Sequence, residues 1–77
     1  MSVIQRITIK EKDGSIIKMY PDQTLKFWDV SRSKDGSGNW YYSMHISTVL
    51  DMLYQAGREN CEVNMNLYGG DKIALQQ

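Results

Sequence analysis

The sequence has little of what usually stabilises a very small protein: it holds one cysteine, Cys61, and one histidine, His45, among 77 residues. A single cysteine excludes a disulfide within the chain, and this pair cannot fill the four positions of a structural zinc site. A domain of this size then depends on regular packing or on oligomerisation. We therefore expect neither a metal nor a cofactor, and we keep a homodimer as an option.

An excess of one charge and a long apolar run are also missing. Nine Lys and Arg balance nine Asp and Glu, so the basic stripe typical of a nucleic-acid-binding protein is not present. No apolar stretch approaches the ~20 residues that span a bilayer, and residues 1–6 reach a charge before any apolar segment, unlike a secretory signal. With the free cysteine, these features predict a cytoplasmic protein without a membrane partner.

The first part of the chain predicts a β-hairpin. Residues 3–11 and 15–20 have strand-like alternation and flank the turn Lys12-Asp13-Gly14. A three-residue loop with Gly14 in the left-handed conformation sets apolar residues opposite one another, which a two-residue turn would not do. The pairs that this loop predicts are Ile7–Met19 and Ile9–Ile17. The one proline, Pro21, then begins a second turn.

Residues 25–44, LKFWDVSRSKDGSGNWYYSM, predict a second hairpin with aromatics on both faces. Its turn repeats the Lys-Asp-Gly-Ser of residues 12–15 at residues 34–37, so we expect the same loop geometry. The face with both tryptophans is heavier and is assigned to the core. The pairs predicted on that face are Val30–Trp40, Trp28–Tyr42 and Lys26–Met44, and those on the second face are Asp29–Tyr41, Phe27–Ser43 and Leu25–His45.

After Met44 the apolar residues follow a helical period. We expect Ser47 to be the N-cap and Gly57 to end the helix. The expected apolar stripe is Ile46, Val49, Leu50, Leu53 and Tyr54, with Thr48, Asp51 and Gln55 on the opposite side.

Two further strands are predicted after this helix. Residues 61–67 alternate as a strand with one buried face, and residues 72–75 form a short edge strand after a glycine turn. The whole chain, residues 1–77, is predicted to be a single α+β domain. Its expected architecture is a small antiparallel sheet, ββββ-α-ββ, with one helix packed on one face.

No catalytic motif stands out. Cys61, His45 and an acidic residue could nominally form a thiol-protease-like group; the acids considered are Asp29 and Asp51. However, Cys61 lies on the apolar phase of its strand, where a buried structural thiol is the ordinary outcome. His45 falls at the junction of strand and helix and fits a polar cap. Residues 35–38 lack the lysine and the helix of a phosphate-binding loop, so the sequence predicts no enzyme.

The aromatic hairpin of residues 25–44 is the feature of the sequence that most clearly indicates a function. One helix covers only one face of a sheet, so the second face of the hairpin is expected to be exposed. Apolar and aromatic side chains with charges at one end have the composition of a protein-binding hot spot. The predicted partner-binding residues are Leu25, Phe27 and Tyr41 as anchors, with Arg32 and Lys34 orienting the partner from the turn. We expect a small non-enzymatic protein-binding module, of the kind that phages and mobile elements encode as inhibitors of host proteins.

Three other functions are kept as alternatives. The first is binding of single-stranded nucleic acid, in which aromatic rings stack on bases and basic residues follow the phosphates. We rank this alternative second because the chain has no net charge, whereas the affinity of a protein for nucleic acid comes mainly from basic residues that neutralise phosphates. The others are an enzyme built around Cys61 and an assembly subunit whose second face is used in self-association. The residues of the nucleic-acid alternative are Tyr41, Phe27 and Trp28 for stacking, with Arg6, Lys10, Lys18 and Lys26 for phosphates.

Overall fold

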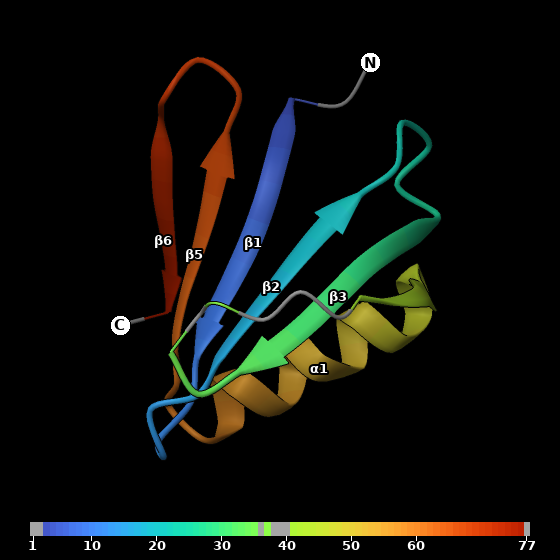
Figure 1. Cartoon of the computed structure of the whole chain (residues 1–77). Coiled ribbons are helices and arrows are strands. Elements are labelled where there is room, and N and C mark those ends of the chain that lie inside the picture. Colours follow the sequence, from blue (N-terminus) through green and yellow to red (C-terminus); the bar gives the residue numbers. More distant parts are fainter. Residues whose placement is uncertain (1–2, 36, 38–40, 77) are drawn as a thin grey trace.

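The computed structural model describes residues 3–35, 37 and 41–76, which form the elements shown in Figure 1. The strands are β1 (Ile4–Lys10), β2 (Ile16–Pro21), β3 (Phe27–Ser33), β4 (Tyr42–His45), β5 (Glu62–Leu67) and β6 (Lys72–Gln76), and the helix is α1 (Ile46–Arg58). Over these residues the strands form one antiparallel sheet of six strands in the order β4-β3-β2-β1-β5-β6. The predicted α+β fold, ββββ-α-ββ with one helix, is confirmed.

The path of the chain leaves the sheet with two free edges. β1 to β4 follow one another as a meander, and α1 then returns across one face so that β5 pairs with β1. Figure 1 shows α1 crossing behind β3, with β6 at the far side of the sheet. β4 and β6 are therefore the edge strands, and in the described part of the chain the face away from α1 carries no helix.

The first hairpin has the predicted register, with the pairs Ile7–Met19 and Ile9–Ile17. Gly14 closes its turn at a φ of 91°, a conformation that glycine adopts without steric cost. Since alternate side chains of a strand share a face, this register turns the four apolar residues toward α1. The buried core consists of Ile7, Ile9, Ile17, Met19, Trp28, Val30, Val49, Ala56, Cys61 and Val63.

The predicted register of the second hairpin is wrong by two residues. The observed pairs are Phe27–His45, Trp28–Met44, Asp29–Ser43 and Val30–Tyr42. The connection between β3 and β4 is longer than the repeated Lys-Asp-Gly-Ser suggested, and the expected partner Trp40 lies outside the described residues. Because side chains alternate with a period of two, a shift of two residues leaves each side chain of the paired strands on its predicted face.

Leu25 was predicted to lie on the second face of a strand, and this prediction is wrong. It precedes β3 in a turn, with a φ of 64°, and its side chain packs against the core. Its carbonyl oxygen accepts a hydrogen bond of 3.1 Å from Nε1 of Trp28. The turn that follows Pro21 is fixed by Asp22, whose Oδ1 accepts from the N–H of Thr24 at 3.1 Å. The chain is therefore still turning at Leu25.

β4 ends at His45 and α1 begins at the next residue, Ile46, so the helix starts earlier than the sequence predicted. The N-cap is His45 rather than the predicted Ser47, because Nδ1 of His45 accepts a hydrogen bond from the N–H of Ser47 at 3.2 Å. The interpretation of His45 as a polar cap is confirmed. The helix ends at Arg58, one residue past Gly57, and Asn60 at a φ of 57° turns the chain toward β5.

Candidate functional site

α1 is rotated relative to the apolar stripe expected from the sequence. Val49 and Ala56 are buried against the sheet and Met52 is half-buried, whereas Leu50 and Tyr54 from the expected stripe are exposed. Ile46 and Leu53 of the expected stripe also pack against the core, so the buried side of the helix overlaps that stripe only in part. The helix leaves space along the flank that carries Met52.

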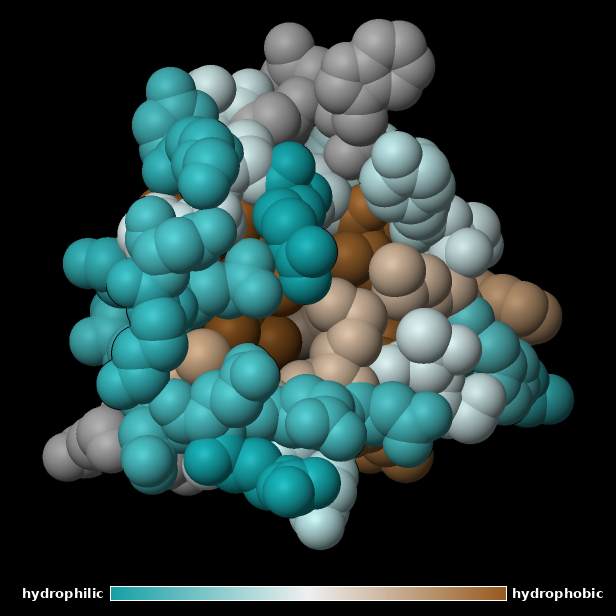
Figure 2. Space-filling model, turned by 90° about the horizontal axis from the view of Figure 1, so that it is seen from below, coloured by the Kyte–Doolittle hydropathy of each residue, from teal (hydrophilic) through white to brown (hydrophobic). Residues whose placement is uncertain are grey.

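That space consists of two adjoining hollows between α1 and the sheet. Both are lined by Ile17, Arg32, Thr48 and Met52, and we call the two together the α1 groove. One hollow has a volume of about 590 Å³ and extends to Tyr42 of β4. The other has a volume of about 290 Å³ and extends to Glu59 beyond the end of α1. Figure 2 shows hydrophobic side chains at the centre of this side of the molecule, with hydrophilic side chains along the left and the bottom of the view.

The floor of the α1 groove is apolar and adaptable. Val30, Met44 and Met52 line the larger hollow. Methionine side chains have three rotatable bonds and a polarisable sulfur, so they adjust to differently shaped partners. Concave apolar surfaces with a few polar groups at the rim are the usual form of a binding site. The groove can therefore take up apolar side chains.

The rim of the groove is acidic. Nε of Arg32 lies 3.1 Å from Oε1 of Glu11, so these two charges compensate each other. Asp51 and Glu59 also line the groove, and among its described lining residues Arg32 is the only base. The excess negative charge favours a cationic group next to the apolar floor.

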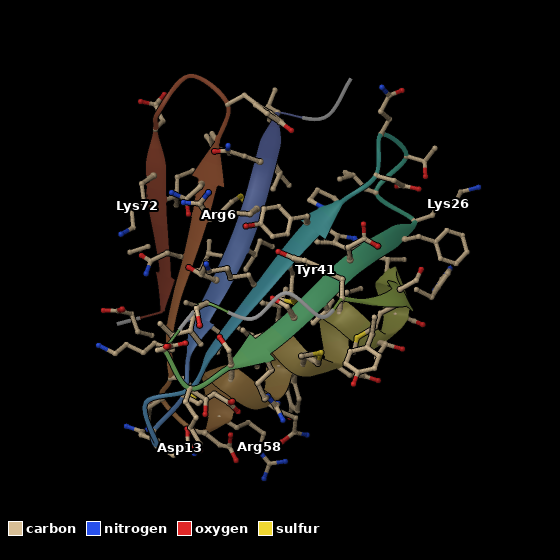
Figure 3. All side chains as sticks on the ribbon, in the orientation of Figure 1. Arg6, Asp13, Lys26, Tyr41, Arg58 and Lys72 are labelled. Carbon is tan, nitrogen blue, oxygen red and sulfur yellow. The ribbon has the colours of Figure 1, made fainter. Side chains whose placement is uncertain are left out.

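The opposite face of the sheet holds the exposed aromatics of the predicted site. Phe27 is 51% exposed, and its ring centroid lies 5.4 Å from that of His45. Tyr41 is 50% exposed and meets Tyr20 edge-on at 6.0 Å. With Asp29, the two tyrosines line a shallow hollow of about 230 Å³. Figure 3 shows Tyr41 and Arg6 in front of the sheet, on the side away from α1.

The structure does not bring the five predicted partner-binding residues into one surface. Phe27 and Tyr41 lie at opposite ends of β4, about 13 Å apart at 3.3 Å per residue. Leu25 packs against the core, and Arg32 lies on the α1 side at the rim of the groove. Nζ of Lys34 lies 3.3 Å from Oδ2 of Asp13, outside both surfaces. That these five residues bind a partner stays a prediction, although they do not form one continuous surface.

The structure separates or buries some of the residues on which the nucleic-acid-binding and the thiol-enzyme alternatives depend. Trp28 is 3% exposed, so its ring is not accessible for stacking on a base. Cys61 and His45 lie at opposite ends of α1, which at 1.5 Å per residue separates them by about 20 Å. In residues 3–35, 37 and 41–76 no group of three His, Cys, Asp or Glu side chains is placed to hold a metal ion.

Sequence reasoning missed the residues that make the groove. It placed Thr48, Asp51 and Gln55 opposite the apolar stripe, and all three are indeed exposed, but it did not predict that they line the hollow next to the sheet. The signal was Met52, an apolar residue outside the predicted stripe. Placing Met52 toward the sheet adds Met52 and Ala56 to Ile46, Val49 and Leu53 on the side of the helix that contacts the core.

These features define a small antiparallel α+β domain whose single described helix leaves an acidic-rimmed apolar groove. Comparisons with protein-family models, curated proteins and solved structures gave no match. Of the helices described, none is long and apolar enough to cross a membrane.

Proposed function

We propose that the protein is a non-enzymatic binding module that holds a segment of another protein in the α1 groove. The observation that carries this proposal is the hollow of about 590 Å³ between α1 and the sheet, with Val30, Met44 and Met52 at its floor. Filling such a hollow removes apolar surface from water, at roughly 25 cal/mol per Å².

The rim indicates the chemistry of the partner segment. Asp51 and Glu59 add negative charge that Arg32 does not balance, since Arg32 is already paired with Glu11. A segment with apolar side chains beside a Lys or Arg satisfies both the floor and the rim. The stretch from Thr48 in α1 to Glu59 just past its end is roughly 17 Å long, which matches about five extended residues.

A selection from a displayed library of random peptides tests this function. We expect the enriched peptides to combine apolar residues with Lys or Arg, and a synthetic copy to bind in fluorescence anisotropy. Thr48→Arg fills the groove and adds a positive charge, so it should weaken binding by about tenfold or more. Leu50→Arg is the matched control, because Leu50 is exposed on the other flank of α1. Enriched peptides that bind Thr48→Arg as well as the unchanged protein would contradict the proposal, as would no enrichment.

Single-stranded nucleic acid is the second candidate ligand. It is favoured by one observation: Arg6 and Lys10 lie on the face away from α1, together with Tyr20 and Tyr41. Titrating a labelled oligodeoxythymidine and a labelled oligouridine at low and high salt separates the two functions. Binding that falls steeply with salt and is lost on Tyr41→Ser would replace our proposal. The role expected from the sequence, inhibition of a host protein, stays a prediction until a partner is known.

A further inference from the structure

Among the residues that the structure describes, no strand pairs with the outer edge of β6, and apart from a register shift at Leu75 this edge has few protective features. Ile73 is 46% exposed and Leu75 is 45% exposed, and the strand holds one charged residue, Lys72, and no proline. Proteins usually block edge strands with charges, prolines or a covering element, because the unpaired peptide groups attract another strand. The other edge, β4, is shorter and passes directly into α1. We propose that β6 pairs antiparallel with β6 of a second copy of this chain.

The hydrogen-bonding pattern of β6 supports this pairing. The N–H of Leu67 donates to the carbonyl oxygen of Asp71 at 2.8 Å. Bonded residues alternate along an antiparallel ladder, so Lys72 and Ala74 turn their peptide N–H and C=O groups away from β5. These groups face the open edge, where a partner strand would meet them.

A two-fold axis at Ala74 gives a self-complementary register. It sets Ala74 opposite Ala74 of the other copy and Ile73 opposite Leu75, so that apolar residues meet across the interface. The two Lys72 side chains then lie at opposite ends of the strand pair and do not repel each other at close range. The register shift between β5 and β6 falls at Leu75, the extra residue between Ala74 and Gln76, so β6 bends at the place where Leu75 would meet Ile73 of the other copy.

The apolar side chains of β5 and β6 next to this edge are also incompletely buried within one copy of the chain. Met65 of β5 lies opposite Ile73 on the α1 side of the sheet, where it packs at the margin of the core. α1 packs mainly against β3, β4 and β5. A joined sheet extends past β6 and shields Ile73 and Leu75 from water. The interface shares no residue with the α1 groove, so it stands independently of the proposed function.

Light scattering coupled to size-exclusion chromatography tests the pairing on the full chain. We expect a mass of twice 8.9 kDa that falls to the monomer value on dilution. Ala74→Pro removes an N–H that faces outward, which an edge strand tolerates, and should give a folded monomer. Ala74→Thr keeps that N–H and should stay dimeric, and Leu75→Lys is a second disrupting variant. A monomer at all concentrations, or a dimer that survives both Ala74→Pro and Leu75→Lys, would overturn the proposal.

A disulfide trap tests the register itself. Bonded antiparallel partners lie about 5.5 Å apart between Cα atoms, which suits a disulfide. With Cys61→Ser as background, Ala74→Cys should form a covalent dimer when oxidised glutathione accepts the two electrons and two protons of the thiols. Lys12→Cys in the same background is the control and should not cross-link. Equal cross-linking of both variants would contradict a two-fold axis at Ala74.

Discussion

Nζ of Lys34 lies 3.3 Å from Oδ2 of Asp13 and ties the segment after β3 to the turn between β1 and β2. The two residues belong to the two copies of Lys-Asp-Gly-Ser in the chain. In both copies the aspartate accepts a hydrogen bond from the N–H two residues later, at 2.8 Å from Ser15 to Asp13 and at 3.0 Å from Ser37 to Asp35. The repeated sequence thus provides the same aspartate-to-serine hydrogen bond twice, and Lys34 of the second copy forms a surface ion pair with Asp13 of the first.

Asp13 should make stability depend on pH in the acid range. The hydrogen bonds from Ser15, with a smaller contribution from Lys34, lower the pKa of Asp13 from 3.8 to about 2. Because the native pKa lies below the unfolded value, the charged form stabilises the fold above about pH 4, and this contribution disappears as the pH falls toward about 2. Urea midpoints measured between those values should fall for the unchanged protein and stay flatter for Asp13→Asn. Lys34→Met keeps the Ser15 hydrogen bonds, so equal flattening by Lys34→Met would argue against this cause.

The core and the groove should respond differently to the loss of a methionine side chain. Met19 is fully buried, so Met19→Ala should lower the free energy of unfolding by about 2–5 kcal/mol. Met52 is half-buried at the groove, where water fills the space of a missing side chain, and Met52→Ala should cost under about 1.5 kcal/mol. Thermal unfolding followed by circular dichroism compares the two. Equal losses would mean that Met52 belongs to the core.

The helix cap offers a prediction with an internal control. His45→Ala leaves the N–H of Ser47 without its acceptor and should cost about 0.5–2 kcal/mol. Asparagine is a strong N-cap, so His45→Asn should recover most of that stability. Urea denaturation measures both variants. If Asn and Ala were equally destabilising, the contact of His45 with Phe27 would be the important one.

The aromatics on the open face should be dispensable for folding. Phe27 and Tyr41 are half exposed, and the double variant Phe27→Ser/Tyr41→Ser should cost about 1–2 kcal/mol while keeping the native circular dichroism spectrum. Trp28→Ser, on the buried side of the same hairpin, should unfold the protein. The double variant should also retain the peptides bound in the α1 groove. Loss of peptide binding with the fold intact would return the binding site to the hairpin face.

Local features of the fold were predictable because they depend on neighbours in sequence. The Asp13-Gly14 turn set the register of β1 and β2, and the alternation after Cys61 placed β5. The faces of β3 also followed from its pattern, since Trp28 and Val30 are buried. The length of the connection to β4 was not predicted, because a turn sequence does not fix how far a loop extends, and the predictions for Leu25 and for the N-cap were also wrong.

The candidate site was not predictable from the same patterns. A helical stripe tells which residues are apolar, but the rotation of a helix on a sheet is decided by what fits beneath it. Val49 and Ala56 are small enough to sit against the sheet, so they are buried while Leu50 and Tyr54 remain exposed. Met52 and Thr48 then border a groove with Ile17 and Arg32 from distant strands.

The sequence by itself determined the order of strands and helix, the turn chemistry and the face to which each β3 side chain points, because periodicity and turn propensity act over a few residues. The tertiary structure alone decided the sheet order, the pairing of Arg32 with Glu11 and the opening of the α1 groove. Those features depend on contacts between residues far apart in the chain, and close packing settles them only when all the elements are in place.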